Sequence, residues 1–345
     1  MKKIGFLSFG HWSDAPRARV PDGGESVRQT VALAVAAERH GFDGAWVRVH
    51  HFSHSLSAPF PLLAAMAART TRIDVGTAVV DLRYENPLYM AEEAGIVDQL
   101  SRGSSGRGRL QLGIGRGSPE PAADGQERFG YFLEEGQTWS EVARERAALF
   151  RKAISGAGLA VSNPLTTHGL PARLPVAPLS PGLEHRIWWG AGSRSGGVFA
   201  GAEGMNMVSS TLMLQDDGRP FHIQQADQIA AYREAYAASG LDTGGQAAVV
   251  RTVFPLVNGD DERFIGQLRE TEDTVGRLDG GPARSGPAFT GPPAEVADRL
   301  AEDDAVGAAD YVLFALPSQF GVDYCSDLMA KLARVAHDLG WKGQA

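Results

Sequence analysis

Cysteine is almost absent from this sequence. Cys325 is the only one among 345 residues, so an intramolecular disulfide cannot form and a multi-cysteine zinc site is excluded. No apolar run reaches membrane-spanning length. No basic run is present, and the formal net charge of −8 disfavours nucleic acid as a partner. The N-terminal "MKKIGFLSFGHW" has too short an apolar run for a signal peptide, so we expect a soluble, cytoplasmic protein.

Apolar runs of strand length alternate with amphipathic segments along the whole chain. The strand-like runs cover residues 4–9, 42–49, 72–80, 109–115, 186–191, 205–210, 248–257 and 311–316. The helical segments cover residues 25–40, 60–70, 87–100, 137–154, 195–204, 222–239, 293–303 and 327–340. Near-continuous apolar strands in such alternation indicate parallel pairing. Eight units favour an α/β fold with a closed (β/α)₈ barrel over a doubly wound sheet with a small second domain.

We expect one domain over residues 1–345 with two long insertions. The first covers about 116–185, after strand four, and the second about 258–292, after strand seven. Long structured insertions are usually lids or binding loops. Both leave the carboxyl ends of strands, which is the face where such barrels carry their chemistry.

The second strand ends in "WVRVHHF", residues 46–52. Alternation places Arg48 and His50 on one face of this strand and His51 on the other. We expect Arg48 inside the barrel, paired with a carboxylate such as Asp74 or Asp81, because a buried charge needs a partner. His50 then reaches the catalytic rim, whereas His51 is structural and bonds backbone or a helix-side partner.

Two alternatives for the histidines remain open. His50 and His51 could both serve only to bond loop carbonyls. A metal site built from His50, His51 and His54 is less favoured, because no HExxH or comparable carboxylate spacing accompanies them. We therefore expect no metal.

Two glycine-rich stretches follow predicted strands. "GIGRGS" (113–118) is not a dinucleotide fingerprint, because Ser118 stands where GxGxxG needs glycine, but it brings Arg116 to a strand end. "GAGSRSGG" (190–197) opens a helix, whose N-terminus can cradle a phosphate. The polar side chains of that turn are Ser193, Arg194 and Ser195. No GxxxxGK[ST] loop is present, so the two turns together suggest a phosphorylated ligand other than one held by a P-loop.

Four segments carry a family resemblance: "WVRVHHF", "TAVVDLRYENPLYMAEEAGIVDQLS", "GRLQLGIGRGSPE" and "IWWGAGSRSGGVFAGAEGMNMVSS". In this order they resemble the bacterial luciferase-like flavin-dependent monooxygenases, the LLM class of flavin-dependent oxidoreductases. The resemblance implies a TIM barrel, which agrees with the count of units. It also implies reduced FMN used with oxygen, or the deazaflavin F420 used for hydride transfer.

The resemblance also implies roles for single residues. His50 matches a histidine near the reactive side of the flavin, and Arg116 matches an arginine that helps to hold the FMN phosphate. Ala78 and Val79 match a non-prolyl cis peptide that supports the isoalloxazine ring. The remaining expected cofactor contacts are Gly117, Ser118, Gly192, Ser193, Arg194, Ser195 and Gly196. Val49 replaces the usual glutamate before the two histidines, which is a departure from the family pattern.

Our leading interpretation is an FMN-dependent monooxygenase that oxygenates a small organic substrate with O2. No nicotinamide site is visible, so a separate flavin reductase would supply the reduced FMN. The alternatives are an F420-dependent hydride-transfer oxidoreductase and a catalytically silent flavin-binding protein. Trp12, Phe52 and Tyr84 suggest an aromatic-lined pocket. The resemblance implies a homodimer joined through the helices at 60–70 and 87–100.

Overall fold

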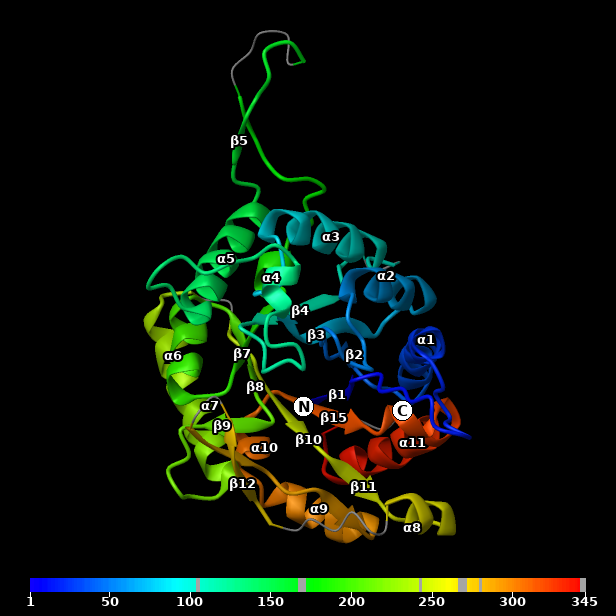
Figure 1. The fold of residues 1–345 in the computed structure, drawn as a ribbon. Coiled ribbons are helices and arrows are strands. Elements are labelled where there is room, and N and C mark those ends of the chain that lie inside the picture. Colours follow the sequence, from blue (N-terminus) through cyan, green and yellow to red (C-terminus); the bar gives the residue numbers. More distant parts are fainter. Residues whose placement is uncertain (104–105, 167–171, 242–243, 266–271, 279–280, 342–345) are drawn as a thin grey trace.

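Eight parallel strands close into a barrel in the computed structural model of this chain (Figure 1). The structure describes all residues except 104–105, 167–171, 242–243, 266–271, 279–280 and 342–345. In spatial order the barrel strands are β1 (Lys3–Ser8), β15 (Tyr311–Leu316), β10 (Ala247–Arg251), β8 (Asn206–Ser209), β7 (Ile187–Ala191), β4 (Leu110–Gly115), β3 (Asp74–Asp81) and β2 (Gly44–Val47). The predicted (β/α)₈ barrel is confirmed.

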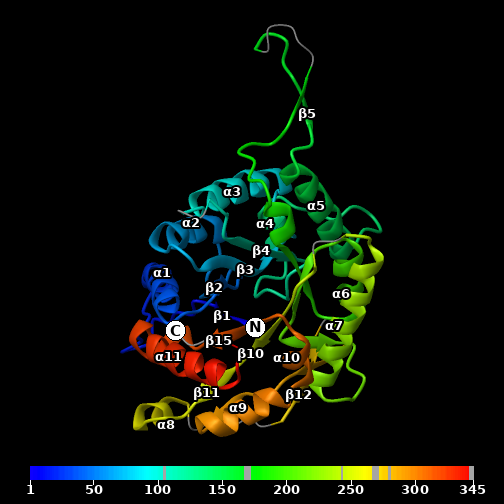
Figure 2. The ribbon, with the colours of Figure 1, turned by 180° about the vertical axis from the view of Figure 1, so that it is seen from behind.

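Helices surround the barrel on all sides (Figures 1 and 2). They are α1 (Gly23–Arg39), α2 (Pro59–Arg69), α3 (Pro87–Leu100), α5 (Trp139–Ile154), α6 (Arg194–Ala202), α7 (Phe221–Ala238), α9 (Pro293–Ala301), α10 (Asp304–Ala308) and α11 (Val322–Asp338). Local sequence sets several starts: Asn86 caps α3 ahead of Pro87, and Thr138 with Glu141 forms a capping box on α5. No helix among the described residues is long and apolar enough to cross a membrane.

Both predicted insertions are present, apart from the parts outside the described residues. The first holds α4 (Gly125–Arg128), α5, the hairpin of β5 (Ala160–Val161) and β6 (Arg173–Leu174), and the 3₁₀ helix η1 (Leu183–Arg186). This hairpin projects away from the barrel in both views (Figures 1 and 2). The second holds α8 (Gly259–Ile265), β12 (Thr274–Leu278), β13 (Gly281–Ser285) and β14 (Phe289–Gly291).

The second insertion is anchored by two small sheets. β12 and β13 join β9 (Leu212–Leu214), which follows β8, in a three-stranded antiparallel sheet. β14 pairs in parallel with β11 (Val253–Pro255). The 3₁₀ helix η2 (Ser318–Phe320) follows β15.

Two predicted strands were too long. Strand two ends at Val47 rather than residue 49, because its chain turns after a last ladder bond from Arg48 N–H to the Ser8 carbonyl, 2.9 Å. Strand seven ends at Arg251 rather than residue 257, since the following β11 leaves the barrel to pair with β14. An apolar run alone could not reveal either break.

Aromatic side chains fill the barrel interior. Trp46 meets Trp188 edge-to-face with ring centres 5.3 Å apart, and Tyr311 lies 5.7 Å from Trp46. All three are buried, and Trp188 and Tyr311 come from the first two residues of their strands. A packed interior of this kind leaves no pore, so the described barrel offers a ligand space toward the carboxyl ends of its strands rather than through its centre.

Candidate active site

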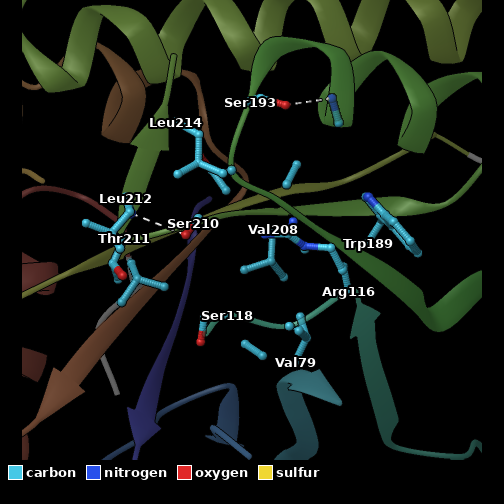
Figure 3. Close-up of a pocket in the computed structure, with 18 of the residues that line it drawn as sticks. Val79, Arg116, Ser118, Trp189, Ser193, Val208, Ser210, Thr211, Leu212 and Leu214 are labelled. Carbon is cyan, nitrogen blue, oxygen red and sulfur yellow. Dashed lines mark hydrogen bonds between the residues drawn. The ribbon is translucent and has the colours of Figure 1, made fainter. Parts of the chain in front are cut away.

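A cavity of about 470 Å³ lies among the carboxyl ends of the strands and the β8–β9 segment (Figure 3). Of the predicted site residues, those that line it are His50, Ala78, Val79, Arg116, Gly117, Ser118, Gly192, Ser193, Ser195 and Gly196. Arg194 does not line the cavity and is exposed at the start of α6. The barrel thus brings together residues up to 146 positions apart in the chain, from His50 to Gly196.

One end of the cavity is suited to an anion. Ser193 is the N-cap of α6, and its hydroxyl accepts the Gly196 N–H at 3.2 Å and lies 3.1 Å from the Ser195 hydroxyl. The N-terminus of a helix carries partial positive charge and unbonded N–H groups. Arg116 from the end of β4 and Arg144 from α5 both line the same cavity. We note that sequence reasoning missed Arg144.

The middle of the cavity is apolar and sterically tight. The Ala78–Val79 peptide bond is cis, as the resemblance implied. Val79 and Val208 lie here together with Trp189, and Leu212 and Leu214 descend from β9 (Figure 3). These side chains would surround a flat ring system with little water.

Gly190 makes the tight packing beside this cis peptide possible. A Cβ atom at Gly190 would stand 2.8 Å from Cγ1 of Val79. That distance is shorter than real Cβ contacts, so β7 can run this close to Val79 only with glycine at this position.

His50 also lines the cavity and is paired with Glu120. Its Nδ1 lies 3.1 Å from Oε1 of Glu120, and Oε2 of the same carboxylate accepts the His51 backbone N–H at 3.2 Å. The Glu120 side chain is only 2% exposed. Sequence reasoning missed Glu120, although it ends the quoted "GRLQLGIGRGSPE". Val49 has no carboxylate to offer His50, and Glu120 from the β4–α4 loop provides one instead.

His51 is buried and points away from the cavity. Its ring stacks on Tyr84 with centres 4.1 Å apart and meets Phe129 edge-on. Burial lowers the pKa of His51. The prediction that its side chain bonds backbone or a helix-side partner was wrong: Nε2 is buried without a hydrogen-bond partner among the described residues, because the ring is held by aromatic stacking instead.

Arg48 reaches the cavity, but its expected partner was wrong. Its guanidinium donates to the Ser118 hydroxyl at 2.9 Å rather than to Asp74 or Asp81. Asp81 instead pairs with Arg83 at 2.6 Å. Burial lowers the pKa of Arg48, and the nearby Glu120 and Asp81 carboxylates oppose that shift.

Asp74 is also engaged elsewhere. It pairs with Arg107 at 3.0 Å and with Lys3 at 3.9 Å. Lys3, Asp74 and Tyr311 all belong to the first residues of their strands, so this carboxylate lies at the end of the barrel opposite the cavity.

The three aromatic residues expected in the pocket do not line this cavity. Trp12 stacks on His54 at 3.8 Å, Tyr84 is buried against His51, and Phe52 is exposed beside Phe129. The aromatic lining comes from Phe9 and Trp189 instead. Trp12, Phe52 and Tyr84 follow the ends of three different strands, and the sequence did not indicate that their side chains would lie outside the cavity.

The metal alternative would need His50, His51 and His54 to share one ion. Among the described residues, no group of three or more His, Cys, Asp or Glu side chains is arranged to hold a metal ion. The three histidines of the metal alternative have separate neighbours: Glu120 for His50, Tyr84 for His51 and Trp12 for His54.

Curated relatives share parts of this sequence. A 4-hydroxyprotoasukamycin monooxygenase from Streptomyces nodosus subsp. asukaensis is 31% identical over 205 residues, covering 52% of this chain and 54% of the relative. The alkanal monooxygenase alpha chain of the Kryptophanaron alfredi symbiont is 36% identical over 113 residues, covering 32% of this chain and 30% of the relative. The matches thus span about half, or less, of these relatives' length.

Solved structures share the fold over nearly the full length. The oxygenating constituent of 3,6-diketocamphane monooxygenase from Pseudomonas putida, in complex with FMN, superposes with a TM-score of 0.70 at 16% identity, covering 97% of this chain and 98% of that one. The coenzyme F420-dependent tetrahydromethanopterin reductase from Methanopyrus kandleri gives a TM-score of 0.61 at 14% identity, covering 95% and 97%.

A family model matches a longer stretch of this chain than either curated relative does. The family model described as "Luciferase-like monooxygenase" matches residues 1–305, which include every residue that lines the cavity. The closed barrel and the cavity at its carboxyl end agree with that match. The chain therefore belongs to the luciferase-like monooxygenase family.

Proposed function

We propose that this protein is the oxygenating component of a two-component monooxygenase that uses reduced FMN and O2 on a small organic substrate. One observation carries the proposal: a cationic helix N-terminus and a histidine–carboxylate pair face the same apolar cavity. The first suits a phosphate and the second suits proton transfer.

The residues present fit FMN. A volume of about 470 Å³ lies within the range of cofactor pockets, which is roughly 300–1,000 Å³. Arg116, Arg144 and the Ser193–Gly196 turn would hold the phosphate. The walls formed by Val79, Val208 and Trp189 would hold the ring system.

Reduced FMN, when bound, supplies the electrons that activate O2. The protein residues would do the rest. The apolar side chains of β9 would exclude water from the reacting groups. His50, whose neutral imidazole can accept a proton and whose cation can return it, would move the proton that oxygen transfer requires.

An F420-dependent oxidoreductase is the second candidate. F420-dependent enzymes share this fold, and F420 would present a phosphate to the same cationic end. A catalytically silent flavin-binding protein is the third candidate, and the buried Glu120 beside His50 disfavours it, because binding alone does not require that pair.

Titration of the purified protein separates these candidates. FMN, chemically reduced FMN and F420 are each added while absorbance and fluorescence are followed, with anaerobic conditions for the reduced flavin. We expect binding of FMN in both redox states. Tight binding of F420 alone would overturn the monooxygenase proposal. Binding of FMN without formation of any oxygenated product on adding a flavin reductase, NADH and candidate substrates would support the silent binder.

We also propose that the protein forms a homodimer. Exposed apolar side chains line α3, and they include Tyr89, Ile96 and Leu100, which are 69%, 49% and 55% exposed. A helix with apolar residues on both faces is usually covered on both. This face agrees with the subunit contact that the family resemblance implied.

A further inference from the structure

The carboxylate of Glu120 accepts two hydrogen bonds of different kinds. Oε2 accepts the backbone N–H of His51 at 3.2 Å, and Oε1 lies 3.1 Å from the Nδ1 ring atom of His50. A backbone N–H can only donate, and an ionised carboxylate can only accept. The guanidinium groups of Arg48 and Arg83 interact electrostatically with Glu120.

We infer that Glu120 is a positioning residue that fixes the tautomer of His50. Against a carboxylate, the neutral imidazole carries its proton on Nδ1, so the lone pair lies on Nε2. Nε2 has no hydrogen-bond partner among the described residues, and the ring lines the cavity. The free lone pair is therefore the one available to a bound molecule. The consequence for turnover rests on the proposed function, whereas the tautomer itself does not.

The position of Glu120 explains how this chain works with Val49. Val49 is buried and apolar, so it gives His50 no charged neighbour. Glu120 comes from a different strand end, 70 residues further along the chain. Its tight burial, together with the second bond to His51, leaves the carboxylate one orientation toward the ring.

An isosteric substitution turns this geometry into a test. In Glu120→Gln the side chain has one oxygen and one NH2 group. The His51 N–H needs an acceptor, so the amide oxygen must face it, and the NH2 group then faces His50 Nδ1. Because the NH2 group only donates, Nδ1 must accept, and the proton of the neutral ring moves to Nε2. The variant thus reverses the tautomer while preserving side-chain volume.

The experiment reads the tautomer directly in the cofactor-free full chain. Long-range ¹H–¹⁵N spectra of ¹⁵N-histidine-labelled protein, recorded at alkaline pH, distinguish the two neutral forms. His50 is assigned by the signal lost in His50→Asn. We expect Nδ1–H in the wild type, Nε2–H in Glu120→Gln, and Nδ1–H again in Glu120→Asp, which restores the carboxylate. Glu135→Gln, the same change at an exposed position, should leave the His50 signal unchanged.

Turnover provides the second measurement. A reversed tautomer in a comparable histidine–carboxylate pair lowers kcat by about 10⁴-fold, so we expect Glu120→Gln to lose roughly 10²- to 10⁴-fold and Glu120→Asp to recover part of it. Finding Nε2–H in the wild type, or Nδ1–H retained in a folded Glu120→Gln, overturns the inference. A reversed tautomer without loss of turnover supports the positioning role but removes His50 from the proposed function, so the two failures are distinguishable.

Discussion

Arg116 directly follows β4, and its side chain lines the cavity near Val208 and Ser118 (Figure 3). We predict that Arg116→Ala weakens FMN binding without unfolding the protein. A charge-assisted contact contributes about 1.5–3 kcal/mol, so affinity should fall roughly 10- to 100-fold. Riboflavin lacks the phosphate and should bind wild type and variant almost equally, as measured by fluorescence titration.

Arg194→Ala is the matched control for Arg116→Ala. Arg194 is exposed and does not line the cavity, so its loss should weaken FMN binding less. If riboflavin affinity falls as far as FMN affinity in Arg116→Ala, the arginine is structural and its assignment to the phosphate fails.

The adjacent histidines should separate by experiment. His50→Ala should keep its fold and lower turnover by ~10²–10⁴-fold, the usual range for losing an acid–base group. Oxygen uptake should continue, with hydrogen peroxide released in place of product. His51→Ala removes a buried ring stacked on Tyr84, so it should lower stability by about 1–2 kcal/mol.

Peroxide released per substrate oxidised, together with a thermal melt, decides between these roles. Full coupled turnover in His50→Ala would disprove the role of His50, and loss of turnover confined to His51→Ala would exchange the two assignments.

At the scale of elements, the entry to α3 should make stability depend on pH. Burial, with Glu93 and Asp81 nearby, raises the pKa of Glu85 to about 7. The folded state then binds more protons than the unfolded state from about pH 4.5 upward, so this group lowers stability as pH rises to about 7. Glu85→Gln should be more stable than wild type by about 1–3 kcal/mol at pH 8 and nearly equal at pH 4.5.

Urea denaturation of both proteins at the two pH values measures this difference. Glu135→Gln, an exposed counterpart, should show the same small difference from wild type at both. An equal gain for Glu85→Gln at both pH values would mean that packing, rather than ionisation, causes it.

Most elements could be predicted because their signals are local. Asn86 and Pro87 mark the start of α3, and the predicted helix over 87–100 has the observed bounds. The end of strand two could not be predicted correctly. The chain leaves the strand in a turn that is held by the hydrogen bond from His50 N–H to the Leu56 carbonyl. Such a bond depends on where the next loop goes, and apolar periodicity carries no information about that.

The candidate site divides in the same way. Sequence placed His50 and the two glycine-rich turns at one rim, because parallel strands share an end. It missed Glu120, which contacts His50, and Arg144, which lines the cavity. Both residues belong to the first insertion, and apolar periodicity does not indicate where an insertion folds. One signal was present for Glu120: Val49 left His50 without an acidic neighbour, and Glu120 was an acid close to another strand end.

For the whole molecule, we expect a homodimer built on α3. Light scattering at micromolar concentration should give twice the chain mass of 36.7 kDa. Ile96→Glu places a charge in the exposed apolar stripe and should give monomers, because an unpaired charge is costly in a buried interface. Val27→Glu on α1, where the residue is 45% exposed, should remain dimeric. A monomeric wild type would end this expectation.

The three-stranded sheet of β9, β12 and β13 forms part of the cavity wall, and its strands are hydrogen-bonded to one another. Leu212 and Leu214 on β9 and Leu278 on β12 all line the cavity, and Asp216 and Arg284 clamp the sheet at 2.7 Å. Cofactor and substrate would then enter the cavity by the same route. Binding and release of either ligand would require the same movement of this sheet. The residence times of both ligands would then depend on how often the sheet moves, and less on the contacts of each ligand. Stopped-flow measurements on Arg284→Ala should show FMN association and dissociation both faster than in the wild type; unchanged rates of both would mean that this sheet does not control access to the cavity.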